Sequence, residues 1–243
     1  ARAFRSHRRS AETARTSGEW ERALLECEGA LRIRNDGELE GWAKECRGRL
    51  ALQRAIPPLQ ERVRDAQLYS YIEGDDYARK QMLVEEALKE LSRLLESGAD
   101  SAEAWTWLGL GFHFIGDLDP AEAALRKALN LDPRRSDAQE ALGRLCLERF
   151  ALELVDNQGY RDAVSRRHLE LWAREAQDHF RSVASPSETG GVLARVAEAY
   201  RAFAERDGPR LMDLCERGER DSGGSMGVEE LYLLRSLIES GDA

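Results

Sequence analysis

The stretch that decides the fold is residues 102–133, which reads AEAWTWLGLGFHFIGDLDPAEAALRKALNLDP. In its first half, bulky side chains recur three and four positions apart, at Trp105, Leu108 and Phe112. This spacing places the three side chains on one face of a helix. The glycine and aspartate at 116–117 then interrupt the pattern, so the stretch predicts a helix followed by a turn.

The second half of the stretch predicts an antiparallel partner helix. Pro120 stands where the first turn of a helix tolerates proline, and Pro133 marks the end of that helix. Leu125 is expected to face inward. Gly109 and Ala121 have almost no side chain, so the two helices can approach each other closely where these residues meet.

The pattern resembles the tetratricopeptide repeat (TPR) family, whose repeat is about 34 residues long. Eight places with a preferred residue type match that repeat: Trp105, Leu108, Gly109, Phe112, Ala121, Leu125, Ala128 and Pro133. The resemblance implies an all-α fold of antiparallel helical hairpins, stacked as a TPR-type right-handed superhelix (an α-α superhelix). It also implies a non-catalytic protein-protein interaction scaffold that binds a peptide or a partner protein.

Composition and charge agree with this class of protein. Of the 243 residues, 42% are hydrophobic, 33% are charged and only 6 are proline, a balance typical of helical chains. The formal net charge of −9 argues against nucleic acid as a partner, because phosphate binding needs a basic stripe. Apolar runs are short, so we expect neither membrane insertion within this segment nor a signal peptide, and we expect a cytoplasmic location.

Weaker copies of the pattern flank the clear repeat, as they must, because one repeat cannot bury its own apolar face. Adding ~34 residues brings Leu142, Gly143 and Cys146 to the places of Leu108, Gly109 and Phe112. We expect one domain over 1–243, with degenerate repeats at 1–56, an irregular long hairpin at 57–100, the clear repeat at 101–135, a degenerate repeat with long helices at 136–185, a degenerate repeat at 186–220 and a terminal or truncated helix at 228–243.

Two details of this organisation can be tested by the structure. A helix over 38–54 is expected to break at Pro57 and Pro58. Val196 and Ala197 are expected on the inner side of a later first helix. In all, the chain predicts five or six helical hairpins.

The TPR resemblance also implies where a partner binds, because the inner faces of the first helices line a concave groove in that family. Carried onto this sequence, the partner-binding candidates are Trp107, Leu110, His113, Phe114 and Arg144. An exposed Trp107 beside Leu110 and Phe114 would form an apolar hot spot. The alternative is that a neighbouring lengthened helix, or the helix expected over 160–183, covers it.

Further groove positions follow from the same alignment: Glu103, Thr106, Glu140, Leu147, Arg195, Glu198 and Arg201. Some TPR domains clamp a carboxylate at the end of a chaperone with a lysine and an asparagine. Thr106 and Leu110 occupy those two places here, which argues against a co-chaperone of that type.

No motif indicates an enzyme, a cofactor or a metal within this chain. The histidines have no ligand spacing and are interpreted as surface or packing residues: His7, His113, His168 and His179. The cysteines form no CxxC pair and are interpreted as buried free thiols, in preference to a disulfide or metal framework: Cys27, Cys46, Cys146 and Cys215. A phosphate-binding loop and a nucleophile elbow are also missing from the sequence.

The context of the chain suggests an alternative function. The sequence has no initiator methionine, so we expect a processed product or a fragment of a longer protein. Its closing stretch, 227–242, resembles the repeat regions that follow the catalytic domain in some bacterial serine/threonine protein kinases. That resemblance implies a regulatory or substrate-recruiting region of a larger enzyme.

The basic start, with Arg2, Arg5, Arg8 and Arg9, is either a solvated first helix or a stretch that joins an upstream domain or membrane anchor. Nothing in the sequence indicates the partner's identity or the oligomeric state.

Overall fold

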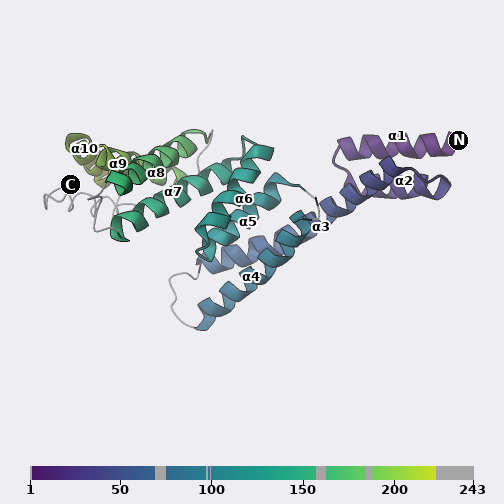
Figure 1. Cartoon of the computed structure of the whole chain (residues 1–243), viewed down its shortest axis with the longest axis horizontal. Coiled ribbons are helices and arrows are strands. Elements are labelled where there is room, and N and C mark those ends of the chain that lie inside the picture. Colours follow the sequence, from purple (N-terminus) through teal and green to yellow (C-terminus); the bar gives the residue numbers. More distant parts are fainter. Residues whose placement is uncertain are drawn as a thin grey trace. The chain divides into compact units, whose positions relative to one another are not determined.

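The computed structural model describes residues 2–68, 75–96, 98, 100–156, 163–183 and 188–222 (Figure 1). These residues form ten helices and, within the same ranges, no strand, so the all-α prediction is confirmed for them. The chain divides into two compact units, Ala1–Leu131 and Asp132–Ala243. Each unit has an apolar core of its own. Whether the two units form the single domain that we expected stays a prediction.

The first unit begins with a hairpin of α1 (Arg2–Thr16) and α2 (Trp20–Ile33). Gly18 lies in the turn with a φ of +76°, a left-handed conformation that glycine adopts without strain. Ala23 and Ala30 of α2 have no exposed surface. These two small residues lie in the cores that α2 shares with α1 and α3.

Helix α3 (Gly37–Leu68) runs through Pro57 and Pro58 without ending, so the break predicted at these two prolines is wrong. A proline in a helix interior lacks a backbone donor and crowds the carbonyl four residues earlier, at a cost of roughly 3 kcal/mol. Both prolines point to solvent, and the apolar residues around them are buried. These buried residues are Leu52, Ile56, Leu59 and Val63. Their burial offsets the cost of the prolines.

The rest of the first unit contains α4 (Asp75–Glu96) and a hairpin of α5 (Ala102–Phe114) and α6 (Leu118–Leu131). Helix α4 packs against α3 and α5. The side chain of Ser101 caps α5 by accepting a hydrogen bond from a backbone N–H of its first turn. Gly116 closes the turn between α5 and α6 with a φ of +85°. The structure thus confirms both predicted helices of the clear repeat and the turn between them.

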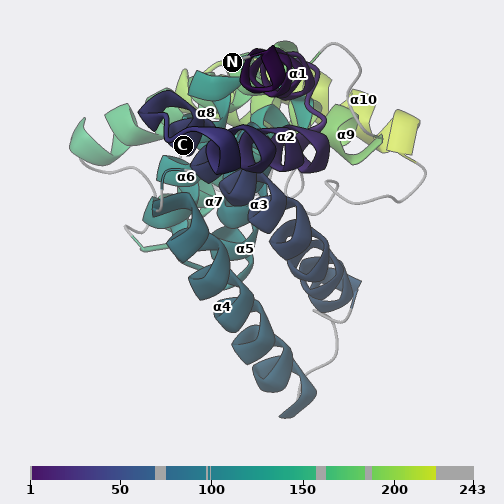
Figure 2. The ribbon, with the colours of Figure 1, turned by 90° about the vertical axis from the view of Figure 1, so that its right-hand side faces the viewer.

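Two apolar stripes lie on different sides of α3. Leu39, Ala43 and Cys46 are buried in the cores shared with α1 and α2. The stripe from Leu52 to Val63 is buried in the core shared with α4 and α5. With 3.6 residues per turn, the two stripes are about 140° apart around the helix axis. One long helix therefore belongs to two successive packing arrangements (Figures 1 and 2).

The close approach of α5 and α6 depends on Gly109. A Cβ atom at this position would lie 2.6 Å from Cγ of Leu125 and 3.1 Å from the backbone oxygen of Ala121. Leu125, Ala121 and Ala128 have no exposed surface. The structure confirms that small residues lie at this crossing. It also confirms that the side chain of Leu125 on the second helix faces inward.

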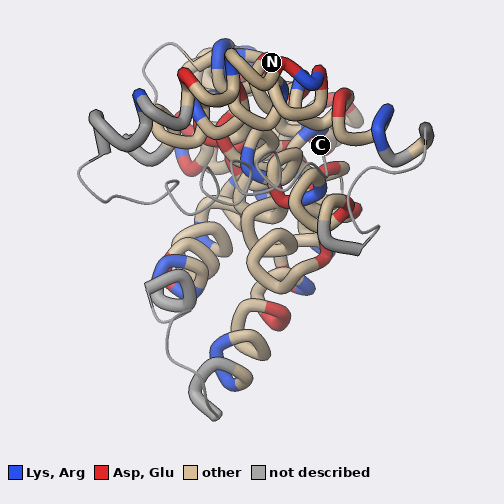
Figure 3. Tube along the Cα trace, turned by 90° about the vertical axis from the view of Figure 1, so that its left-hand side faces the viewer, with Lys and Arg blue, Asp and Glu red and all other residues tan. Residues whose placement is uncertain are grey.

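Four described helices make up the second unit: α7 (Ser136–Asp156), α8 (Ala163–Arg181), α9 (Glu188–Ala204) and α10 (Gly208–Ser222). Each packs against the next one in the chain. In both units, positions of positive and negative charge are interspersed along the helices (Figure 3). Such mixed charge is typical of helix faces in contact with solvent.

Aromatic rings fill the core of the second unit. Phe150 of α7 is fully buried, and its ring stacks on Tyr200 with a centroid distance of 4.2 Å. Gly143 lies where α7 crosses α8, because a Cβ atom there would be 2.7 Å from the ring of Phe180. Gly143 follows Gly109 by ~34 residues, one repeat length. A glycine at a helix crossing thus occurs in both units at this spacing.

Some predicted features lie outside the described residues. These are the terminal helix at 228–243 and the side chain of Cys215. In the part of the chain that the structure describes, no helix is long and apolar enough to cross a membrane.

Candidate partner-binding site

Four of the five predicted partner-binding residues lie on α5: Trp107, Leu110, His113 and Phe114. All four side chains are half-buried. Positions 107, 110 and 114 are three and four residues apart, so they share one face of the helix. Arg144 lies on α7 in the second unit. Its place beside the α5 residues therefore stays a prediction.

Part of the Trp107 side chain is covered by α3. The guanidinium of Arg64 lies 5.8 Å from the centroid of the indole ring, and the ring packs against the core of α3, α4 and α5. A basic group over an indole face is worth about 0.5–2 kcal/mol. A partner that contacts this face of Trp107 must therefore compete with Arg64.

The other four tryptophans have similar neighbours. Each is half-buried, and each has a basic or histidine side chain against its ring: Trp20 with Arg49, Trp42 with Arg8 and Arg15, Trp105 with Lys127, and Trp172 with His168. A tryptophan whose ring is contacted by a basic or histidine side chain is thus the usual arrangement in this chain. Trp107 shares its helix face with two further half-buried apolar side chains, Leu110 and Phe114.

Thr106 was expected in the groove, and this prediction is wrong. Its side chain is fully buried, and its hydroxyl donates a hydrogen bond to the carbonyl of Ala102 at 2.8 Å. A threonine within a helix often satisfies its hydroxyl in this way, which lets it enter an apolar core. Glu103, by contrast, is exposed and accepts a hydrogen bond from Gln60 on α3.

A groove of about 550 Å³ lies between α4 and the end of α5, and sequence reasoning missed it. The apolar part of its wall is formed by Leu88, Phe112 and Ile115. The polar and charged residues around them carry both signs: Glu85, Lys89, Ser92, Arg93, Glu96 and Asp117. The groove combines an apolar surface with a charged border, which is the usual composition of a peptide-binding site.

Gly111 is the sequence signal that could have revealed this groove. A Cβ atom at Gly111 would lie 2.5 Å from Cδ2 of Leu88, so α4 approaches α5 very closely here. Gly109 and Gly111 are two residues apart and face different sides of the helix. One permits contact with α6 and the other permits contact with α4. Two glycines at this spacing indicate a helix that is closely packed on two sides.

Arg144 is held along α7 by its neighbour Glu140. The two side chains form an ion pair at 4.0 Å, with 37% of Arg144 and 12% of Glu140 exposed. The carboxylate of Glu140 lies against α9, where a Cβ atom at Gly190 would be 2.7 Å from it. The guanidinium of Arg144 therefore pairs with a largely buried carboxylate that lies close to α9.

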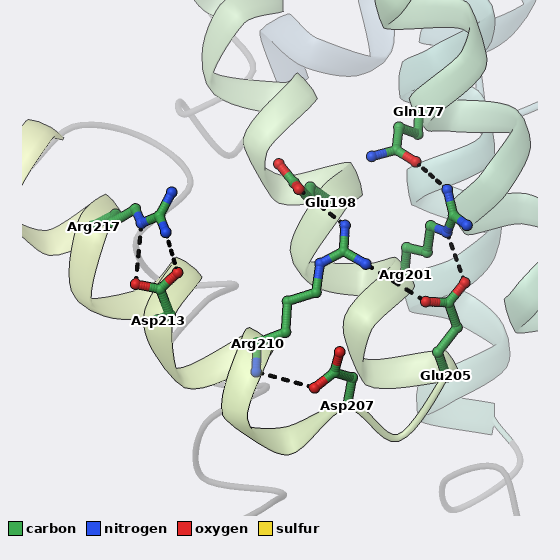
Figure 4. A network of polar contacts seen from close by, with 8 residues as sticks. All are labelled: Gln177, Glu198, Arg201, Glu205, Asp207, Arg210, Asp213 and Arg217. Atoms are coloured by element: carbon green, nitrogen blue, oxygen red, sulfur yellow. Dashed lines mark hydrogen bonds and ion pairs between the residues drawn. The ribbon is translucent and has the colours of Figure 1, made fainter.

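Glu198 and Arg201, two further predicted groove positions, belong to a polar network that links α8, α9 and α10 (Figure 4). Arg201 donates to Gln177 at 2.7 Å and pairs with Glu205 at 2.7 Å. Arg210 donates to Glu198 at 3.0 Å, and this hydrogen bond raises the pKa of Arg210. Gln177 is only 4% exposed. These side chains satisfy one another, so their first role is to hold the three helices together.

Histidine side chains contact polar neighbours in both units. Nδ1 of His7 lies 2.6 Å from a carboxylate oxygen of Glu26, and Nδ1 of His179 lies 2.7 Å from Oε1 of Gln139. Among the described residues, no group of three or more histidine, cysteine, aspartate or glutamate side chains could hold a metal ion.

Three of the cysteines, Cys27, Cys46 and Cys146, are buried thiols outside any disulfide, as predicted. Burial raises the pKa of the Cys27 thiol to about 11, and the nearby Cys46 acts in the same direction. Burial also raises the pKa of Cys46. Since the thiolate is the reactive form of cysteine, these two residues are structural rather than chemically active.

No protein-family model matches the chain, and no curated protein matches its sequence. The geometry of the helix faces is therefore the basis for a functional assignment.

Proposed function

We propose that this chain is a non-catalytic scaffold that binds a peptide or a partner protein through the faces of its helical hairpins. The observation that carries the proposal is α5. This helix presents the half-buried Trp107, Leu110 and Phe114 on one face, and its far end contributes Phe112 to the wall of the groove beside α4. Half-exposed aromatic and aliphatic side chains next to charges of both signs are typical of protein-binding surfaces.

A TPR-type stack is part of the same proposal, and the repeat frame supports it. Gly109 and Gly143 occupy the same place of the repeat and each lies at a helix crossing. At the preceding place, Leu108, Leu142 and Val196 are all buried. Ala197, which stands at the place of the two glycines in the later repeat, is buried too. Equivalent places thus perform equivalent packing tasks, which is the property expected of stacked repeats.

The predicted residues can be tested by affinity capture of partners from a cell lysate, using three forms of the full chain. The first is wild type, the second carries Trp107→Ala with Arg144→Glu, and the third carries Leu110→Glu. Removing a binding hot spot costs about 2 kcal/mol or more, which corresponds to roughly 30-fold weaker binding. We expect both variants to lose partners that wild type retains, as measured by quantitative mass spectrometry.

A matched control comes from α8. Leu171 is 50% exposed and lies in the second unit, so Leu171→Glu adds the same charge at a surface leucine outside α5. The helicity of every variant is checked by circular dichroism. If all variants retain the same partners as wild type, the α5 face does not bind them and this part of the proposal fails.

A further inference from the structure

A second groove lies on the hairpin of α1 and α2, and we call it the basic groove. It encloses about 810 Å³ and is lined by seven residues: Arg2, Arg5, Ser6, Arg9, Ser10, Thr13 and Arg22. The first six come from α1 and are spaced so that they form one continuous helix face. Arg22 comes from the first turn of α2. The groove is therefore built by one face of α1 and the start of its partner helix.

Every charged side chain that lines the basic groove is an arginine. Arg2, Arg5 and Arg9 are exposed, and their guanidinium groups have no ion pair among the described residues. Arg22 pairs with Glu19 at 3.0 Å, and its hydrogen bond lowers the pKa of Glu19. Three of the four positive charges in the groove thus have no internal counter-charge.

The arginines on the other side of α1 are arranged differently. Arg8 pairs with Asp36, and Arg15 pairs with Glu45 at 3.1 Å. Both guanidinium groups also lie over the ring of Trp42. The arginines that face α3 are therefore neutralised by the fold, whereas the arginines of the basic groove are not.

This uncompensated row is unfavourable for the isolated chain. Arg2 and Arg5 are three residues apart, and Arg5 and Arg9 are four residues apart, so like charges are neighbours on one helix face. A helix surface with no binding role would gain stability from an acidic residue in this row. The row also stands out in a chain whose formal net charge is −9. An anionic occupant would remove the repulsion.

We propose that the basic groove binds an acidic segment of a partner protein. The distance from Arg2 to Arg9 along α1 is about 10 Å, at 1.5 Å per residue. Carboxylates that recur every three or four residues on a facing helix have the same spacing. Guanidinium groups bind carboxylates through two parallel hydrogen bonds, and the hydroxyls of Ser6 and Ser10 add donors between them.

Other anionic occupants fit the groove less well. Arg2, Arg5 and Arg9 recur over about two turns of α1, a spacing that matches a row of carboxylates better than a single phosphate. No aromatic side chain lines the groove, so nucleic-acid bases have nothing to stack on. The apolar side of α1, with Phe4, Ala11 and Ala14, is buried inside the hairpin, so α1 cannot insert that side into a membrane surface.

The binding test uses the full chain and a fluorescein-labelled synthetic peptide in which glutamate recurs every three to four residues. Fluorescence anisotropy measures binding at low and at physiological ionic strength. We expect binding that weakens as salt is added, because exposed charge pairs are screened. A peptide of the same length with glutamine in place of glutamate is expected not to bind. If the acidic peptide does not bind at low ionic strength, the proposal is overturned.

Two double variants with equal charge change separate the groove from general electrostatics. Arg5→Glu with Arg9→Glu alters the groove, whereas Arg54→Glu with Arg174→Glu alters exposed arginines on α3 and α8. We expect at least about tenfold weaker peptide binding for the first pair and little change for the second. Because the altered side chains are exposed, circular dichroism should show unchanged helicity.

Three results would contradict the assignment. Equal weakening by both pairs would show that only net charge matters. Tighter binding of a single-stranded oligonucleotide, or of phosphatidylserine vesicles, would assign the groove to another class of partner. These variants leave α5 unchanged, so this proposal and the proposed function can fail independently.

Discussion

Gly109 shows how much of the packing depends on a missing methyl group. The close contact with Leu125 Cγ and the Ala121 backbone oxygen leaves no room for a Cβ atom. Overpacking of this kind costs about 1–3 kcal/mol, whereas alanine gains about 1 kcal/mol of helix propensity over glycine. We therefore expect Gly109→Ala to lower the free energy of unfolding by about 1 kcal/mol, measured by urea denaturation.

Gly41 on α3 provides the matched control. A Cβ atom at Gly41 has no heavy atom within 4 Å, and the residue is exposed. Gly41→Ala should therefore raise the free energy of unfolding by up to about 1 kcal/mol. If both substitutions changed stability in the same direction, the contact at Gly109 would not be the cause.

At the scale of single residues, the sequence was informative where a contact is local. Gly109 and Ala121 belong to one hairpin, and the sequence alone predicts that the helices approach closely there. Arg64 and Trp107, or Leu88 and Gly111, come from helices whose relative rotation no short pattern determines. The partial cover of Trp107 and the groove beside α4 could therefore be found only in the structure.

Helix α3 is the element on which sequence reasoning failed. Pro57 and Pro58 are strong local signals for a helix end, but the core around Leu52 and Leu59 outweighs them. The two apolar stripes lie on different sides of α3, so no single periodic face runs along its length. The continuous helix could therefore not be recognised from hydrophobic periodicity. Propensity is a weak prior when tertiary packing supports the opposite conformation.

Pro58→Ala is expected to stabilise the protein. Alanine restores a backbone donor in the interior of α3 and removes the crowding of the carbonyl four residues earlier, a gain of about 1–3 kcal/mol. The measurement is the thermal unfolding midpoint. Pro120→Ala, in the first turn of α6, should leave the midpoint nearly unchanged, because that turn needs no helical donor. A lower midpoint for Pro58→Ala would mean that the proline shapes α3 to fit its neighbours.

At the scale of the whole chain, the division into two units has a direct consequence. The described cores that contain Leu39, Cys46 and Leu88 are each made only of residues before 132. We therefore expect residues 1–131, produced alone, to be helical by circular dichroism and to unfold in one cooperative transition. A broad, non-cooperative transition would show that this unit depends on the rest of the chain.

The change of side along α3 limits how its length can vary in related proteins. Each residue turns a helix by 100°, so one residue inserted or deleted between Cys46 and Leu52 would rotate one stripe away from its partners. Seven residues, about two full turns, would restore the alignment. The interval between Cys46 and Leu52 therefore acts as a spacer that sets the rotation of one stripe relative to the other, and its length matters more than its residue identity.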